Sequence, residues 1–377
     1  MYKLVFILTS LGVVVISYIL IFLFIHNYIK STALLLEIFP LIEPRPLSVL
    51  EKEPIKKEVE IISGKNILKT DIWIPGDLDD KKKYPAIILS AGVNLPKDDH
   101  RILATIKGLA KSGFVVVVSD VPELLASRYL SSTINDFVNI FQFVEEQPYV
   151  EKTKVGFAGF CLGSSFALLA SSEEEIRDRV SYILVNDVLY DMYKFTRDAV
   201  TEKINDNEPV IDWYAEDETR EILYREYSDY IIDDKEGYLI FQTLFKRERL
   251  TEEQYKNLSN DGKVFYDFLS NTDPNKSPEL FARLPEEAKK IIDNMSPKTK
   301  IRDVKAKLFV TSGRNVFLPA SQAKDLVSDL PKDQVSYTSL EFFQHDKTVK
   351  SENAFENIIQ AMFAIKHLKN VFDFVQH

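Results

Sequence analysis

One short stretch of the chain joins a nucleophilic side chain to the glycines that could expose it. The sequence Gly159-Phe160-Cys161-Leu162-Gly163 follows the apolar run 155–160 and precedes an apolar run of small residues. This order predicts a strand, a sharp turn and a helix, with Cys161 on the turn. Glycines two positions either side of a nucleophile avoid collisions with the adjoining strand and helix. The stretch therefore predicts a nucleophile elbow, and unpaired N–H groups at the helix start favour a thiolate there.

The same stretch also fits a cysteine that is only structural. Free cysteine is among the residue types most often buried, and short motifs occur by chance. The strand before Cys161 and the helix after it favour the catalytic interpretation.

A nucleophilic thiol needs a base, and the chain has five histidines. Four of them are placed elsewhere by the sequence: His26 at the end of an apolar run, His100 in a loop, His367 in the last helix and His377 at the terminus. His345 follows the last predicted strand, at 335–342. Active groups gather beyond the carboxyl ends of parallel strands, so we predict that His345 is the base.

The group that orients the base is expected after the strand pattern 306–311. The following loop holds no carboxylate before Asp325, which lies inside the next predicted helix, and Asn315 is its best candidate. An amide oxygen can fix an imidazole tautomer, as in Cys-His-Asn enzymes. Asn315 also fits an ordinary turn residue, and Asp187 or Asp191 could serve instead.

Attack on a carbonyl creates an oxyanion that needs N–H donors. The backbone N–H of Leu162, directly after the nucleophile, is one expected donor. The loop after the apolar run 86–91 supplies the other, at Gly92 or Val93, although Gly92 also fits a plain turn.

Buried strand patterns alternate with helical patterns along the body of the chain. The strand patterns are 86–91, 114–119, 155–160, 180–185, 306–311 and 335–342, with two earlier strands at 58–62 and 67–74. Such alternation implies right-handed crossovers and a mostly parallel sheet covered on both faces. Residues 191–300 interrupt it with a polar, helix-rich insertion, whose aromatic side chains we expect mainly to pack it onto the body.

The chain begins with an uncharged apolar segment at residues 4–25. It is long enough to span a bilayer as a helix, and no small-x-small cleavage site follows it. We predict a transmembrane anchor at 1–30, a Pro-containing linker or stalk at 31–56, and a body at 57–377. A single pass with the amino terminus inside would place the body outside the cytoplasm.

Composition excludes several function classes. A net charge of -10 without a basic patch argues against nucleic acid as a partner. One cysteine permits no intrachain disulfide. Neither a Cys/His cluster with metal-ligand spacing nor a glycine-rich phosphate loop occurs, so we expect no metal and no cofactor.

The order Cys161, Asn315, His345 on this alternation resembles the α/β-hydrolase superfamily, and within it the dienelactone hydrolases and related membrane-anchored esterase-like proteins. The resemblance covers about 57–369 and rests on the elbow, Ser90-Ala91-Gly92, Gly113-Phe114, Ser119-Asp120-Val121-Pro122, the loop 313–319 and His345. It implies an α/β-hydrolase fold, a Cys-His-Asp triad, and hydrolysis of esters or lactones through an acyl-enzyme. The chain departs from that pattern at Asn315, which stands in the place of the acid.

Three functions are compatible with these residues. The first is a membrane-anchored hydrolase acting on a small-molecule ester, thioester or lactone. The second is a hydrolase fold without activity, used as a tethered binding or scaffold domain, which Asn315 and the large insertion favour. The third keeps the site but transfers the acyl group to another acceptor.

Overall fold

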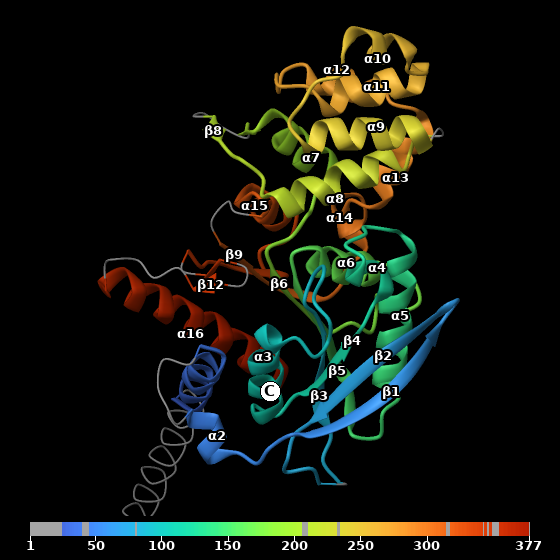
Figure 1. Ribbon diagram of the computed structural model, residues 1–377. Coiled ribbons are helices and arrows are strands. Elements are labelled where there is room, and N and C mark those ends of the chain that lie inside the picture. Colours follow the sequence, from blue (N-terminus) through green and yellow to red (C-terminus); the bar gives the residue numbers. More distant parts are fainter. Residues whose placement is uncertain are drawn as a thin grey trace, which may run out of the picture.

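An eight-stranded sheet runs through the molecule, with helices on both faces (Figure 1). The computed structural model describes residues 25–39, 45–79, 81–205, 210–231, 234–313, 317–341, 343–344, 347–348 and 354–376. In spatial order the strands are β1 (Ile55–Ser63), β2 (Asn66–Ile74), β4 (Val115–Ser119), β3 (Tyr84–Ser90), β5 (Val150–Phe160), β6 (Tyr182–Asn186), β9 (Lys307–Ser312) and β10 (Val335–Ser339). β2 pairs antiparallel with both β1 and β4, and the other pairs are parallel. The predicted α/β-hydrolase-like fold, with a mostly parallel sheet, is confirmed.

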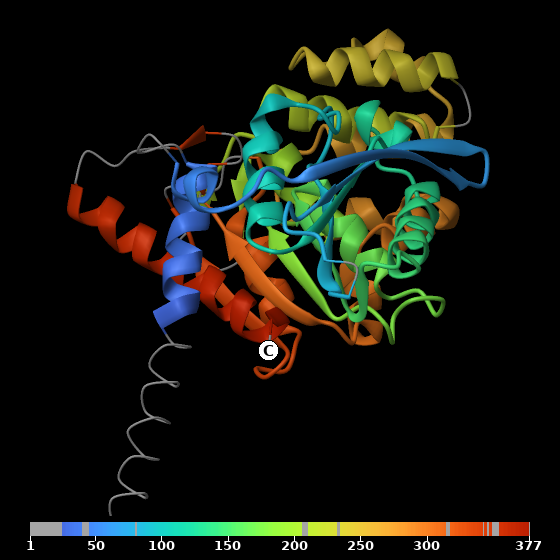
Figure 2. The same cartoon turned by 90° about the horizontal axis from the view of Figure 1, so that it is seen from below.

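The strands between the two edge strands divide their apolar side chains between two cores, one on each face of the sheet. In β4, Val115 and Val117 belong to one core, and Val116 and Val118 to the other. The first face is covered by α5 (Ser132–Glu145), α6 (Leu162–Ala170) and α15 (Ala320–Ser328). The second is covered by helical residues 25–38, α3 (His100–Lys111) and α16 (Ala354–Gln376) (Figures 1 and 2). Because both faces of these strands are buried, their sequences are continuously apolar.

A helical cap is inserted between β6 and β9, at the end of the sheet where β5 and β6 finish (Figure 1). Its elements are α7 (Met192–Thr201), β7 (Lys203–Ile204), β8 (Ile211–Asp212), α8 (Asp217–Ser228), α9 (Asp234–Phe245), α10 (Glu252–Asn257), α11 (Asn260–Leu269), α12 (Ser277–Ala282), α13 (Glu286–Asn294), α14 (Pro297–Lys300) and the 3₁₀ turn Ile301–Asp303. Tyr227, Phe265 and Phe268 are fully buried within it. Some aromatic residues of the insertion therefore form a hydrophobic core within the insertion itself.

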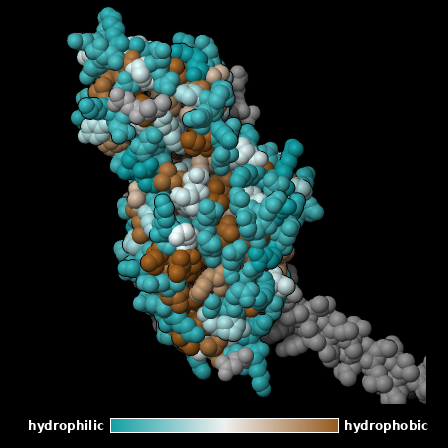
Figure 3. Space-filling view, turned by 90° about the vertical axis from the view of Figure 1, so that its right-hand side faces the viewer, coloured by the Kyte–Doolittle hydropathy of each residue, from teal (hydrophilic) through white to brown (hydrophobic). Residues whose placement is uncertain are grey.

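The remaining described elements are short. They are α2 (Pro46–Leu50), α4 (Pro122–Leu125), β11 (Phe343–Gln344) and β12 (Lys347–Thr348). The face shown in Figure 3 is largely hydrophilic towards its upper end, and hydrophobic side chains gather mainly in its lower half.

The segment before β1 contributes to the body rather than acting only as a spacer. Residues 25–38 are helical, and Leu34 of this helix is fully buried. Asn27 Nδ2 donates to Asp373 Oδ1 at 2.7 Å, and Lys30 Nζ donates to Gln376 Oε1 at 2.8 Å, which joins this helix to α16. Within the part of the chain that the structure describes, no helix has both the length and the apolar character needed to cross a membrane. Most of the predicted span, residues 4–24, lies outside the described residues.

A buried ion pair fastens the cap to the body. Arg128, after α4, donates from Nε to Glu226 Oε1 of α8 at 2.7 Å, and Tyr129 N donates to the same oxygen at 3.0 Å. The Glu226 side chain is only 1% exposed. Because removal of one partner leaves a buried charge unpaired, Arg128→Met is expected to lower the free energy of unfolding by about 3 kcal/mol or more.

Urea denaturation would measure this loss. The matched control is Lys152→Met, which removes an exposed pair with Glu146 whose side chains are 53% and 69% exposed. Lys152→Met is expected to lower the free energy of unfolding by less than about 1 kcal/mol. Equal effects of the two substitutions would contradict the proposed role of Arg128.

Candidate active site

The turn between β5 and α6 holds Cys161 in a backbone conformation that side chains rarely adopt. Its φ is 52° and its ψ is -121°. A non-glycine residue with positive φ is strained, and such strain concentrates at functional sites. A Cβ on Gly159 would lie 2.4 Å from Ser164 N, and one on Gly163 would lie 2.5 Å from Ser90 Oγ. Both glycines are therefore required by close packing, as the sequence predicts for a nucleophile elbow.

The thiol of Cys161 is protonated at neutral pH. Burial raises its pKa to about 12, and the negative charges of Asp187 and Glu218 act in the same direction. A hydrogen bond from the backbone N–H of Leu162 lowers the pKa, but by less than burial raises it. The sequence-based expectation of a thiolate favoured by the helix start is wrong for this state, because desolvation outweighs the helix N-terminus. A base is needed before this sulfur can attack.

The loop after β3 lies directly against the elbow. A Cβ on Gly92, whose φ is 97°, would lie 3.2 Å from Phe160 O and 3.8 Å from Cys161 Cβ. Val93 and Asn94 line the same cavity as Cys161 and Leu162. The structure thus brings together Leu162, Gly92 and Val93, the three residues predicted to supply the oxyanion donors.

Ion pairs and hydrogen bonds hold that loop in place. The backbone N–H of Lys97 donates to Asp120 Oδ1 at 2.8 Å, and Lys97 Nζ lies 2.7 Å from Asp71 Oδ1. Asn94 N donates to Leu124 O at 2.9 Å. These bonds tie the loop to the ends of neighbouring elements, so that its donors have a fixed direction.

Asp187 is the carboxylate that the fold places next to the elbow. It follows β6, the neighbour of β5, and its Oδ1 accepts from Gly313 N at 3.0 Å. Its own N–H donates to Thr311 O at 3.0 Å, and Cys161 N donates to Asn186 O at 3.0 Å. Burial raises the pKa of Asp187 to about 6. This aspartate therefore lies between the nucleophile turn and the start of the loop that carries Asn315.

Asp191, the other alternative carboxylate, has a structural role. It caps the N-terminus of α7 by accepting from Lys194 N at 3.0 Å. Its second oxygen lies 2.9 Å from Lys298 Nζ. Both oxygens are used within the cap, so of the two alternative aspartates Asp187 remains the candidate beside Cys161.

Asn315 and His345, the predicted orienting residue and base, lie outside the described residues. Gly313 and Phe317 flank the first of them, and Phe317 lines the cavity of Cys161. His100 is exposed on α3 beside Asp99. His367 is buried, with its Nδ1 3.1 Å from Thr338 Oγ1, and burial lowers its pKa to about 4.

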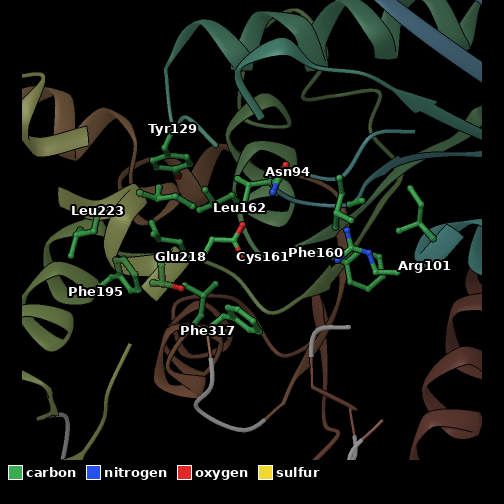
Figure 4. Close-up of a pocket in the computed structure, with 18 of the residues that line it drawn as sticks. Asn94, Arg101, Tyr129, Phe160, Cys161, Leu162, Phe195, Glu218, Leu223 and Phe317 are labelled. Carbon is green, nitrogen blue, oxygen red and sulfur yellow. The ribbon is translucent and has the colours of Figure 1, made fainter. Parts of the chain in front are cut away.

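A cavity of about 320 Å³ opens over the elbow (Figure 4). Its wall combines the body, the cap and the helix at 25–38, through residues such as Tyr129, Leu162, Phe195, Leu223 and Ile38. In the view of Figure 4, Cys161 lies between Phe195 and Leu223 on one side and Arg101 on the other. This size suits a small organic ligand. Among the described residues, no group of three or more His, Cys, Asp or Glu side chains is placed to hold a metal ion.

One buried carboxylate oxygen in the cavity wall lacks a hydrogen-bond partner. Glu226 lines the cavity, and its Oε2 is buried with no donor within reach, whereas Oε1 receives Arg128 and Tyr129. Glu226 could not be predicted from the sequence, because its partners lie 97 and 98 positions away along the chain. An unpaired buried oxygen is costly unless a ligand or water supplies a donor.

Part of the chain is similar in sequence to a known protein family. Residues 78–217 match the Dienelactone hydrolase family. The matched range contains Gly92, Cys161 and Asp187 and ends before Asn315 and His345. No protein of curated function matches the chain in sequence.

Solved structures with related folds include larger peptidases. The dipeptidyl peptidase 4 of Porphyromonas gingivalis is 13% identical, with a TM-score of 0.46, over 84% of this chain and 36% of that one. The acylaminoacyl peptidase of Pyrococcus horikoshii is 13% identical, with a TM-score of 0.49, over 89% of this chain and 44% of that one. The chain therefore spans less than half of either peptidase.

A dienelactone hydrolase from Anabaena variabilis is closer in length. It is 11% identical, with a TM-score of 0.44, over 85% of this chain and 99% of that one. The strand order and the elbow fit the family match, and together they support a hydrolase. We conclude that this chain has an α/β-hydrolase-like fold and carries, over residues 78–217, a segment similar to the dienelactone hydrolase family.

Proposed function

We propose that this protein hydrolyses an ester, thioester or lactone with Cys161 as the nucleophile. The observation that carries the proposal is a thiol on a strained turn that lines a cavity, with Leu162 N–H directed at it and the 92–94 loop beside it. A residue with only a packing role has no need of positive φ on a tight turn.

The proposed reaction passes through an acyl-enzyme. A base, which we assign to His345, takes the proton from Cys161 Sγ, and the sulfur attacks the acyl carbon. The oxyanion that forms accepts hydrogen bonds from Leu162 N–H and from the loop at Gly92 and Val93. The base then gives its proton to the leaving alcohol or thiol. Water activated by the same base hydrolyses the thioester, releasing the acid and restoring the thiol.

The orienting group for that base is proposed to be Asp187. Its carboxylate lies beside the elbow, directly after β6, the strand between β5 and β9, and its Oδ1 already accepts from Gly313 N. A carboxylate stabilises an imidazolium better than the amide of Asn315 does. In this assignment Asn315 is a residue of the loop that Asp187 anchors.

Acyl-enzyme trapping tests the proposal directly. The protein is mixed with excess p-nitrophenyl acetate, quenched in acid and examined by intact mass and peptide mapping. We expect one acetyl group per chain, on Cys161, formed in a burst of p-nitrophenol. Acetylation spread over lysines without a burst would contradict a nucleophilic role for Cys161.

The raised pKa of the thiol favours a second candidate, a binding domain without catalysis. The pH dependence of alkylation by iodoacetamide separates the two. An unassisted thiol with a pKa of about 12 should react about tenfold faster per pH unit from 7 to 10. A thiol paired with an imidazole should instead reach a plateau near neutral pH.

We also propose that residues 1–30 attach the protein to a membrane. The uncharged run 4–25 supports this, and the adjoining described surface exposes Ile25 and Ile29. Extraction of membranes with alkaline carbonate should leave the full chain in the pellet. Its quantitative release would argue against an anchor.

A further inference from the structure

A second cavity, of about 150 Å³, adjoins the elbow, and Gly159 and Phe160 are part of its wall. It is lined by residues of the helix at 25–38, of α3, of α16 and of the sheet. Its wall is mainly aliphatic and aromatic, for example Leu34, Leu35, Leu109, Leu184, Ala364 and Leu368. Among the described residues that line it, none is Lys, Arg, Asp or Glu. The buried imidazole of His367 is neutral there, because burial lowers its pKa to about 4.

The two cavities adjoin at the residue that precedes the nucleophile. Phe160 lines both of them, and so do Ile38, Phe39 and Thr105. Cys161 follows Phe160 at once and lines the first cavity. A chain attached to a carbonyl at the Cys161 sulfur could therefore pass Phe160 and enter the second cavity.

The polar groups of the first cavity lie mainly away from this apolar chamber. Glu218 and Glu226 belong to α8 of the cap, and neither lines the second cavity. Cavities with mainly apolar walls hold water poorly and take up apolar ligands. An empty apolar space also lowers stability, so its position next to a nucleophile fits ligand binding better than a packing fault.

We propose that the second cavity binds the hydrocarbon chain of the acyl group, and that the substrates are esters or thioesters of linear, medium to long acyl chains. This assignment rests on the proposed hydrolase function. The acyl carbonyl lies at Cys161 and its chain runs past Phe160. The alcohol or thiol part lies on the cap side, towards Glu218 and Glu226.

A chain-length series of p-nitrophenyl esters, from acetate to dodecanoate, tests the assignment. We expect kcat/KM to rise about fourfold per added methylene until the chamber is full. Ala364→Leu places three extra carbons in the chamber from α16 and should lower the dodecanoate-to-acetate ratio of kcat/KM at least tenfold. Ala104→Leu is the matched control, since Ala104 lies on α3, which also flanks the chamber, but lines neither cavity. The control variant should have the same dodecanoate-to-acetate ratio of kcat/KM as the parent.

Ligand binding separates this proposal from the catalytic one. In a Cys161→Ala protein, calorimetry should show one saturable site for dodecanoate, weakened at least tenfold by Ala364→Leu. If Ala364→Leu does not fold, Leu35→Phe fills the same space from the helix at 25–38. Ester hydrolysis without chain-length preference and without dodecanoate binding would overturn the chamber but leave the hydrolase. Dodecanoate binding by a parent protein that cleaves no ester would overturn the hydrolase function but leave the chamber as an acyl-chain site.

Discussion

Replacing Cys161 with alanine is expected to lower kcat/KM for short activated esters about 10⁴-fold or more, because the variant loses the only atom that can form the acyl-enzyme. The chain has one cysteine, so no second thiol can take over. The turn should survive, since Cβ is kept and the backbone bond from Cys161 N to Asn186 O is unaffected. Stopped-flow detection of p-nitrophenol would measure both the burst and the steady rate.

Cys161→Ser is the matched control for this experiment. It keeps a nucleophilic atom and the same shape, but a hydroxyl gives up its proton less readily than a thiol. We expect activity between that of the parent and the alanine variant, with an ester-linked intermediate. Thermal unfolding should show that both variants fold like the parent. An alanine variant as active as the parent would place hydrolysis elsewhere in the protein.

Asp187→Asn is expected to lower kcat/KM about 10³-fold while leaving the loop geometry in place. The asparagine carbonyl can still accept from Gly313 N, as Oδ1 of Asp187 does at 3.0 Å. What it loses is the negative charge that would stabilise the imidazolium during proton transfer. Asn315→Ala is the comparison: if Asp187 is the orienting group, that change should cost much less. A larger loss at Asn315 than at Asp187 would restore the assignment made from the sequence.

The same substitution should change the pH dependence of both activity and stability. Burial raises the pKa of Asp187 from 3.8 to about 6, so the parent should lose activity as pH falls below 6 and the carboxyl protonates. Folded protein holds this proton more tightly than unfolded protein. Stability therefore falls as pH rises from 3.8 through 6, by about 2 kcal/mol after allowance for partial exposure.

Asp187→Asn removes that stability loss, so the variant should be the more stable protein at pH 8 although it is the less active one. Unfolding midpoints and kcat/KM measured from pH 4 to 9 would test the pair of effects. Parallel loss of activity and stability at pH 8 would show that Asp187 serves mainly to hold the fold together.

The sheet and the elbow were predictable because their signals are local. Continuous apolar runs such as 115–118 mark strands buried on both faces, and they fall where β4 and its neighbours lie. The glycines of the elbow were predictable for the same reason, since the residues they avoid are Ser164, one turn away, and Ser90 on the adjoining strand β3. Such contacts follow from strand, turn and helix geometry alone.

The electrostatics of the site could not be predicted in the same way. The pKa of Cys161 depends on how completely the cap and the helix at 25–38 cover it, and helix position alone suggested the opposite direction. Asp187 gains its place from the pairing of β6 with β5 and β9, which a list of strands does not provide. The Arg128–Glu226 pair joins residues far apart in the chain, so no periodic pattern could reveal it.

The helix at 25–38 and the residue after it supply Ile38 and Phe39 to the walls of both cavities. A shortened protein that starts at residue 57, where the strand pattern begins, would lack that wall and open both chambers to water. If that shortened protein were inactive, the cause would be the missing wall of the two cavities rather than a loss of reactivity at the Cys161 sulfur. Recombinant forms meant for enzymology should keep the chain from residue 25 onward.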